Sequence, residues 1–199
     1  MRLILASTSP FRQAMLRQAG LTFEAVKPAF DEWLPQGSLP DAVALMLAEG
    51  KAEAVAELHP DAVVIGADQV GECEGVLLGK PQDEAAAFTQ LKQLLGRTHR
   101  LITGVVLMGP VPEDGGARAT LRIVDETRIT FRSLTDDALK AYVATREWEG
   151  CAGGYRLEGQ GVLLVEKIEG DYFNIIGLPL IPVLEGLRRL GIDPLVPSP

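Results

Sequence analysis

The sequence LILASTSPFR occupies residues 3–12 and changes from apolar to polar after its fourth letter. Residues 3–6 predict a short buried strand, and Pro10 predicts the first turn of a helix, where its missing N–H costs nothing. A strand that enters a helix through hydroxyl residues presents backbone N–H groups to an anion. Ser7 adds a hydroxyl, and Arg12 adds a planar guanidinium suited to phosphate. The stretch therefore predicts either a phosphate-binding turn or a plain helix cap, since Ser and Thr are common caps.

A second buried strand is predicted over residues 62–67 (AVVIGA), with Asp68 at its C-terminal end. Carboxylates at the ends of such strands point into the ligand crevice of α/β folds. Asp68 is therefore interpreted as a metal ligand or a general base toward water, and the alternative is a turn former or helix cap. Two related chemistries are excluded. The sequence has no GxxxxGK[ST] loop, and Val70 stands where an aspartyl-phosphate phosphatase has its second Asp.

Two lysines and an acidic pair add to the candidate site. Lys51 follows Gly50 inside a predicted helix, where a glycine predicts a close packing contact, and Lys80 lies between Gly and Pro in a stiff turn. Either ammonium group can neutralise phosphate, although a lone lysine is more often a solvated surface residue. Asp31 and Glu32 are interpreted as cation ligands or as surface charge.

The order of the predicted elements indicates an α/β fold. Strands and helices alternate early in the chain, with Asp83 as a helix cap, whereas paired strands dominate later. Two hairpins are expected, over residues 71–78 with a turn at Glu74-Gly75 and over residues 161–176, and the last helix is expected over residues 179–190. This order predicts a mixed sheet with two lobes, and a cleft between lobes is the default ligand site.

The composition excludes several classes of protein. The chain has 199 residues, of which 47% are hydrophobic, enough for a substantial core. Its formal net charge of -8 argues against a nucleic-acid partner, because phosphate backbones recruit basic surfaces, yet a few cations can still form a local anion site. Cys73 and Cys151 lack the spacing of a zinc site or a disulfide framework. No apolar run approaches the roughly 18 residues of a membrane span, so we expect no membrane partner and a cytoplasmic protein.

Several segments in succession resemble the Maf family of nucleoside triphosphate pyrophosphatases. They are LILASTSPFRQAMLRQAGL, the DE pair at residues 31–32, LAEGKA around Lys51, VVIGADQV, LLGKPQDEAAA, LLGRTHRLITGV and NIIGLPL. The matches cover nearly the whole chain in order, so the resemblance implies a single Maf-like domain over residues 1–199. From the sequence itself we expect residues 193–199 to be a loose tail. It also implies the fold shared with inosine triphosphatases, a mixed sheet flanked by helices with two lobes around a central cleft.

The resemblance implies an enzyme that hydrolyses the α–β phosphoanhydride of a nucleoside triphosphate, giving a nucleoside monophosphate and pyrophosphate. It implies a divalent cation, Mg²⁺ or Mn²⁺, and in many members a homodimer. Carried over by motif, Asp68 is the general base or a metal-side carboxylate, and Glu32 is a second metal residue. The residues implied to contact phosphate are Ser7, Arg12, Lys51 and Lys80. Such cations offset the charge that makes a triphosphate resist attack.

Three positions resemble the branch of the family that hydrolyses 7-methyl-GTP. They are Phe11 after Ser-Pro, Gln69 after Asp68, and Glu158 in a later loop; the pyrimidine-nucleotide branch usually has Thr and Gln at the last two. The methylated base is cationic, so it gains from an aromatic face and from a carboxylate that accepts from its N1–H and amine. The chain departs from the family pattern at Gln13, where a second arginine is usual, and at Phe11, where this branch usually has Trp.

Two rival functions stay open. One is a pyrophosphatase for dTTP, UTP or another non-standard nucleotide. The other is a nucleotide-sensing regulator linked to cell division, for which we expect tight binding without release of pyrophosphate. Asp68 and Lys80 together favour the enzyme, because a sensor does not require a general base.

Overall fold

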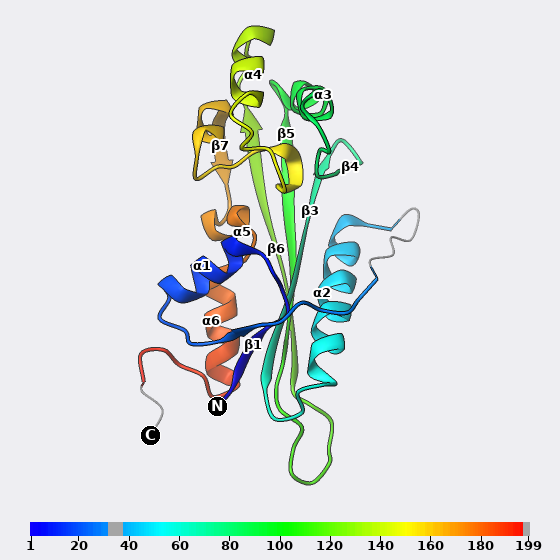
Figure 1. Cartoon of the computed structure of the whole chain (residues 1–199), viewed down its shortest axis with the longest axis vertical. Helices are drawn as coiled ribbons and strands as arrows, with labels where there is room; N and C mark the ends of the chain where they lie inside the picture. Colours follow the sequence, from blue (N-terminus) through cyan, green and yellow to red (C-terminus); the bar gives the residue numbers. More distant parts are fainter. Residues whose placement is uncertain (32–37, 197–199) are drawn as a thin grey trace. The chain divides into compact units, whose positions relative to one another are not determined.

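The computed structural model describes residues 1–31 and 38–196, and it has an α/β fold (Figure 1). Glu32 lies outside the described residues, as does the end of the predicted tail. The chain divides into two compact units. Unit 1 comprises residues 1–68, 103–125 and 177–199, and unit 2 comprises residues 69–102 and 126–176.

The described strands form one seven-stranded sheet in the order β2-β1-β3-β5-β6-β7, with β4 paired to β3. They are β1 (Leu3–Leu5), β2 (Glu24–Ala25), β3 (Val63–Cys73), β4 (Val76–Leu78), β5 (Thr98–Met108), β6 (Thr120–Phe131) and β7 (Val165–Glu169). β1 pairs in parallel with β2 and β3, whereas β4 and β7 pair antiparallel with β3 and β6. The sheet is therefore mixed and flanked by helices, which confirms the predicted fold class. Strands β3, β5 and β6 each run through both units.

In unit 1, helices cover both faces of the sheet (Figure 1). They are α1 (Pro10–Gln18), α2 (Pro40–Ala56) and α6 (Leu180–Arg189). Alternate residues of β5 point to opposite faces, as strand geometry requires. Val106 and Met108 share a buried cluster with residues of α2, whereas Leu107 contacts the α6 face so closely that a Cβ at Gly186 would lie 2.4 Å from its Cδ1.

Two glycines let the backbone of α2 lie directly on the sheet. A Cβ added at Gly66 on β3 would lie 2.2 Å from the carbonyl oxygen of Ala48. A Cβ added at Gly104 on β5 would lie 2.5 Å from the backbone of Ala44. No side chain fits at such a distance, so the sequence at these two strand positions fixes how closely α2 packs.

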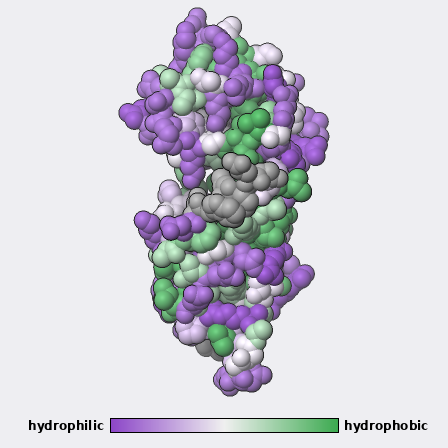
Figure 2. All heavy atoms as spheres, turned by 90° about the vertical axis from the view of Figure 1, so that its right-hand side faces the viewer, coloured by the Kyte–Doolittle hydropathy of each residue, from purple (hydrophilic) through white to green (hydrophobic). Residues whose placement is uncertain are grey.

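Unit 2 contains α3 (Glu84–Leu94), α4 (Asp136–Val143), α5 (Tyr172–Ile176) and two short 3₁₀ helices. Asp83 accepts a hydrogen bond of 2.8 Å from the Ala86 N–H, which confirms the predicted helix cap. The face of unit 2 beside α3 is largely hydrophilic, with a small hydrophobic area (Figure 2). None of the helices in residues 1–31 and 38–196 combines the length and hydropathy that crossing a membrane requires.

The first predicted hairpin is confirmed. β3 and β4 pair as Gly71 with Leu78 and Cys73 with Val76. Glu74 and Gly75 form the turn with positive φ values of 51° and 84°. Positive φ at both central residues is the geometry that matches the twist of a two-residue hairpin.

Two other predictions about elements are wrong. β3 continues through Asp68 to Cys73, so Asp68 lies within a strand rather than at its end. Polar side chains interrupt the apolar pattern there, but backbone pairing does not depend on side-chain polarity. Residues 161–176 do not form a hairpin, since β7 pairs with the distant β6 and the chain then enters α5. Periodicity cannot distinguish a strand from a helix in so short an apolar run.

Candidate functional site

The turn between β1 and α1 holds Ser7, and the first turn of α1 holds Arg12, two of the residues predicted for phosphate. Ser9 is the N-cap of α1, because its Oγ accepts a hydrogen bond of 3.4 Å from the Arg12 N–H. The capping interpretation therefore applies to Ser9. Ser7 is buried, and its Oγ accepts a hydrogen bond of 3.1 Å from the Ser9 N–H. The same Oγ lies 3.5 Å from Nη1 of Arg12, so hydroxyl and guanidinium are neighbours.

Arg12 ties three segments of unit 1 together. Its Nε donates to the carbonyl of Gly177 at 2.8 Å, and its Nη1 donates to the carbonyl of Ala67 at 2.8 Å. Ala67 directly precedes Asp68 on β3. Two backbone carbonyls therefore hold the guanidinium of Arg12 beside Asp68, the predicted general base, and they fix the plane of the guanidinium.

Lys51 and Asp68 form an ion pair inside unit 1. Their side chains are only 12% and 15% exposed. The pair forms because α2 packs closely on β3, as the glycine contacts described above require. Gly50 contributes a further contact, since a Cβ there would lie 2.2 Å from the ring of Phe30. The close contact predicted for Gly50 is thus confirmed.

We call Ser7, Arg12, Lys51 and Asp68 the Asp68 cluster. All four lie in unit 1 and converge on the segment 67–68 of β3. Two cations and one carboxylate give the cluster a formal charge of +1, although the whole chain carries -8. A local positive group of this kind attracts an anion even on an acidic protein.

The Asp68 cluster also suits a cation bound together with a nucleotide. Across residues 1–31 and 38–196, no three His, Cys, Asp or Glu side chains are grouped to hold a metal ion by themselves. Mg²⁺ usually takes one or two carboxylates and completes its shell with water and substrate phosphates. Asp68 supplies one carboxylate beside the cations expected to hold phosphate. The donor set therefore fits a metal that arrives with the substrate.

The predicted residues Gln69, Lys80 and Glu158 belong to unit 2. Gln69 directly follows Asp68 on β3, and its Nε2 donates to the carbonyl of Asn174 at 2.6 Å. Lys80 is exposed after β4, and Glu158 is exposed in the loop between the 3₁₀ helices.

The thiol of Cys151 lies among charged groups of unit 2. Burial raises its pKa, and the negative charge of Glu158 acts in the same direction. A hydrogen bond with Arg156 and the positive charge of Lys80 oppose that increase in pKa. The thiol therefore stays protonated at neutral pH, as expected for a cysteine without nucleophilic function. Lys80 and Glu158 both lie close enough to Cys151 to affect the pKa of its thiol.

The sequence interpretation missed Arg156. Its Nε lies 3.6 Å from Oε1 of Glu158. The only available signal was the spacing of the two charges in Arg156-Leu157-Glu158, which does not reveal contact in an irregular loop. Asn174 was also missed, although it is the one polar side chain in the apolar run FNIIGLPL.

Phe11 and Gln13 both lie half-buried on α1. The Oε1 of Gln13 accepts a hydrogen bond of 2.9 Å from Arg17, one helical turn later. Pairs four residues apart stabilise a helix surface. This contact gives Gln13 a structural role on α1 in place of the arginine that the family pattern has there.

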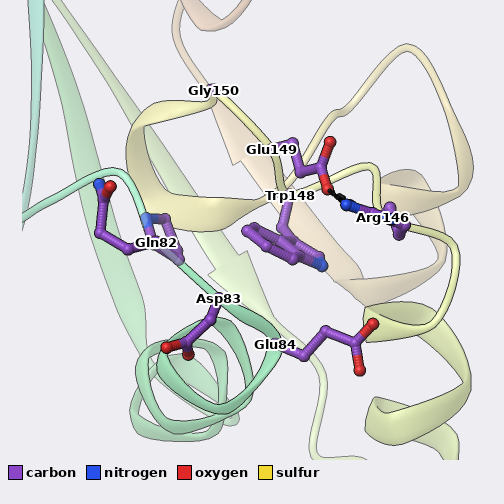
Figure 3. Close-up of a pocket in the computed structure, with 8 residues that line it drawn as sticks. Gln82, Asp83, Glu84, Arg146, Trp148, Glu149 and Gly150 are labelled. Carbon is purple, nitrogen blue, oxygen red and sulfur yellow. Dashed lines mark hydrogen bonds and ion pairs between the residues drawn. The ribbon is translucent and has the colours of Figure 1, made fainter.

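A separate pocket of about 340 Å³ lies in unit 2 (Figure 3). Trp148 is one of the residues that line it, and Arg146, also in the lining, donates to Glu149 at 2.6 Å. Asp83 and Glu84 also line it, so carboxylates outnumber cations. An anionic triphosphate is repelled by such a lining. The described lining contains none of the residues that the sequence predicts for phosphate.

Comparison with known proteins links the chain to one family. The model of the family described as Maf-like protein matches residues 2–190. A protein of Moorella thermoacetica named dTTP/UTP pyrophosphatase is 46% identical over 193 residues, which cover 96% of each chain. A protein of Deinococcus radiodurans with the same name is 44% identical and covers 96% of this chain and 94% of its own length. A Bacillus cereus protein, again with that name, is 38% identical over 96% of this chain and 97% of its own length.

Solved structures give weaker matches. The Ham1 protein of Staphylococcus aureus has a TM-score of 0.45 and 18% identity, covering 66% of this chain and 72% of its own. A HAM1 protein from Coxiella burnetii has a TM-score of 0.39 and 16% identity, covering 65% of this chain and 73% of its own.

Proposed function

Because the chain belongs to the Maf-like protein family, we propose that it is a nucleoside triphosphate pyrophosphatase that prefers dTTP and UTP. The reaction hydrolyses the α–β phosphoanhydride and releases a nucleoside monophosphate and pyrophosphate. The observation that carries this proposal is the Asp68 cluster, in which a carboxylate is ion-paired with Lys51 and flanked by Arg12. Relatives named for this activity match 96% of the chain at up to 46% identity.

In this mechanism Asp68 accepts a proton from the attacking water. The water oxygen bonds to the α-phosphorus, and the α–β bridging oxygen leaves with pyrophosphate. Lys51 has three N–H donors, so it can hold Asp68 and a phosphate oxygen together. Arg12 is held by backbone carbonyls and contributes a fixed positive charge beside the α-phosphate. Charges placed before the reaction stabilise the transition state because they need no reorganisation.

A divalent cation belongs to this proposal. Asp68 would hold it within the described residues, with Glu32 as a second residue proposed from the family motif. Bound there, the cation supplies charge neutralisation on the phosphate oxygens. Gln69, Phe11 and Glu158 are proposed to contact the base.

The preference for pyrimidines rests on charge as well as on relatives. Glu158 strengthens the binding of a cationic 7-methylguanine only if no other cation already offsets the negative charge of its carboxylate. Arg156 lies 3.6 Å from Glu158 and offsets that charge before any nucleotide binds. A neutral thymine or uracil does not depend on it. The second candidate substrate is 7-methyl-GTP, which Gln69 and Glu158 favour because they match the residues of that branch.

Release of pyrophosphate from a panel of triphosphates tests the proposal. The panel contains dTTP, UTP and 7-methyl-GTP, each with Mg²⁺ and with Mn²⁺. We expect kcat/KM for dTTP and UTP to exceed that for 7-methyl-GTP by at least about tenfold, the value of one good hydrogen bond or charge contact. A higher kcat/KM for 7-methyl-GTP would reverse the assignment, and binding of nucleotides without any pyrophosphate would favour a regulator.

The variant Arg156→Ala sharpens this experiment. Without Arg156 the charge of Glu158 is no longer offset, so relative turnover of 7-methyl-GTP should rise severalfold. Arg146→Ala is the matched control, since Arg146 is an exposed arginine of the same unit that pairs with Glu149. An equal change in both variants would show that the Arg156–Glu158 pair does not set the preference.

A further inference from the structure

Asn174 occupies a fully buried position in unit 2. Its Nδ2 donates to the carbonyl of Leu101 on β5 at 3.0 Å and to Oγ1 of Thr127 on β6 at 3.0 Å. Its Oδ1 has no hydrogen-bond partner among the described residues. A buried amide with one atom that lacks a hydrogen bond lowers the stability of the fold. The two hydrogen bonds that Nδ2 donates must therefore offset this loss. These bonds fasten α5 to two strands of the sheet.

The anchoring extends to the start of α5. Thr127 is also fully buried, and its Oγ1 exchanges hydrogen bonds with the backbone of Asp171 at 3.0 and 3.1 Å. Asp171 then accepts from the Phe173 N–H at 2.9 Å, which begins the helix. The backbone of Asn174 is thus fixed on both sides, by its own side chain and by the preceding turn.

The backbone carbonyl of Asn174 receives the side chain of Gln69. In a helix of five residues this carbonyl is among the last four, which have no partner within the helix. The Nε2 of Gln69 donates a hydrogen bond of 2.6 Å to this carbonyl. A carbonyl only accepts, so the amide of Gln69 must direct its nitrogen toward Asn174 and its oxygen away from it. The contact therefore sets which way round the Gln69 amide lies.

We propose that Asn174 is a positioning residue for base selection, which it controls by fixing the orientation of the Gln69 amide. This inference rests on the proposed function, in which Gln69 contacts the base. Uracil and thymine present a ring N–H beside a carbonyl, whereas cytosine presents a bare ring nitrogen beside an amino group. An amide of fixed orientation complements only one of these patterns, while an amide able to turn over complements both. Fixed orientation therefore lets the enzyme prefer UTP to CTP.

The test measures kcat/KM for UTP and CTP by release of pyrophosphate. Wild type is expected to favour UTP by about tenfold or more, the value of one hydrogen bond made or left unmade. Asn174→Ala removes the anchor of the carbonyl, so the ratio should fall toward one. In the Gln69→Ala background, Asn174→Ala should change the ratio no further, because the residue through which it acts is gone.

Additional variants separate positioning from general weakening of the fold. If Asn174→Ala does not fold, Thr127→Val removes one of its two acceptors, and Thr127→Ser restores the hydroxyl and should restore the ratio. Ile129→Val is the matched control, because Ile129 is fully buried on the same strand and its side chain has no polar group. It should lower stability without moving the UTP to CTP ratio.

The outcomes separate this inference from the proposed function. Absence of pyrophosphate release by the wild type overturns the proposed function. Release with equal kcat/KM for UTP and CTP overturns the inference alone, as does an unchanged ratio in folded Asn174→Ala. A ratio that falls equally in Ile129→Val also overturns it, since the effect then comes from weakened packing.

Discussion

At the scale of single residues, the chemistry depends on charged groups that the fold has largely removed from water. Lys51 and Asp68 are paired in a site where each side chain is less than one-sixth exposed, at 12% and 15%. A pair so little exposed to solvent keeps its geometry, because separating the two side chains breaks a charge-assisted hydrogen bond that little water is present to replace. This pairing gives the proposed base a defined direction before substrate binds.

His99 provides a prediction about stability at acidic pH. It is fully buried between Phe131 and Tyr155, and its Nε2 lies 2.8 Å from the Tyr155 hydroxyl. Burial lowers the pKa of His99 from 6.5 to about 4. The unfolded chain therefore binds a proton below pH 6.5 that the folded protein takes up only near pH 4. Stability is fully present above pH 6.5 and is lost as the pH falls toward 4, by at most about 3 kcal/mol.

Chemical denaturation of wild type and His99→Phe between pH 4 and 7 measures this effect. The free energy of unfolding of the wild type should fall more steeply over that interval than that of the variant, which has no group to titrate at this position. Parallel curves for the two proteins would contradict the assignment to His99.

At the scale of elements, α2 is the part of the fold that places Lys51. Gly66 and Gly104 allow its backbone to contact β3 and β5, and a side chain at either position would push the helix away. The site therefore depends on residues that take no part in the chemistry. A shift of α2 moves Lys51 relative to Asp68, which lies on the strand that the helix covers.

Gly66→Ala tests this dependence. Its Cβ would lie 2.2 Å from the Ala48 carbonyl oxygen, so we expect a loss of about 1 to 3 kcal/mol of stability and a fall in kcat of at least about tenfold. Gly109→Ala is the control, because its Cβ would make only ordinary contacts at 3.5 Å. Thermal unfolding and release of pyrophosphate measure both effects. Full activity in Gly66→Ala would show that close packing of α2 does not position Lys51.

Local signals explain which elements the sequence predicts well. Asp83 caps α3, Glu74-Gly75 forms the hairpin turn, and Pro10 begins α1, each through interactions within a few residues of the chain. The strand position of Asp68 was predicted wrongly because β3 pairs with β5, which lies far along the chain, as well as with β4. The same cause explains α5, whose start depends on Thr127 of β6.

At the scale of the whole molecule, the candidate residues are divided between two units. Ser7, Arg12, Lys51 and Asp68 belong to unit 1, whereas Gln69, Lys80 and Glu158 belong to unit 2. The division falls on β3 between Asp68 and Gln69. One strand therefore carries the proposed general base and, at the next position, a residue proposed to contact the nucleobase. Three of the four residues proposed for phosphate thus belong to unit 1 and Lys80 to unit 2, whereas Gln69 and Glu158, two of the three residues proposed for the nucleobase, belong to unit 2 and Phe11 to unit 1.

Family motifs predict this set because each motif is contiguous in sequence. They could not predict Arg156 beside Glu158 or Asn174 beside Gln69, since those contacts arise from loop geometry and from pairing over 105 residues. The residues missed are therefore those that contact the proposed site residues and affect their charge or orientation. The preference for one nucleobase is thus the part of the function that the motifs determine least.

The variant Asp68→Asn tests the central claim most directly, in an assay that detects pyrophosphate and inorganic phosphate separately with UTP and Mg²⁺. Wild type should release pyrophosphate and UMP, and Asp68→Asn should lose at least about 100-fold in kcat, the lower range for a general base, while it remains folded. Asp61→Asn, on an exposed acid before the same strand, should keep full activity. Near-normal kcat in Asp68→Asn, or release of inorganic phosphate in place of pyrophosphate by the wild type, would contradict the account.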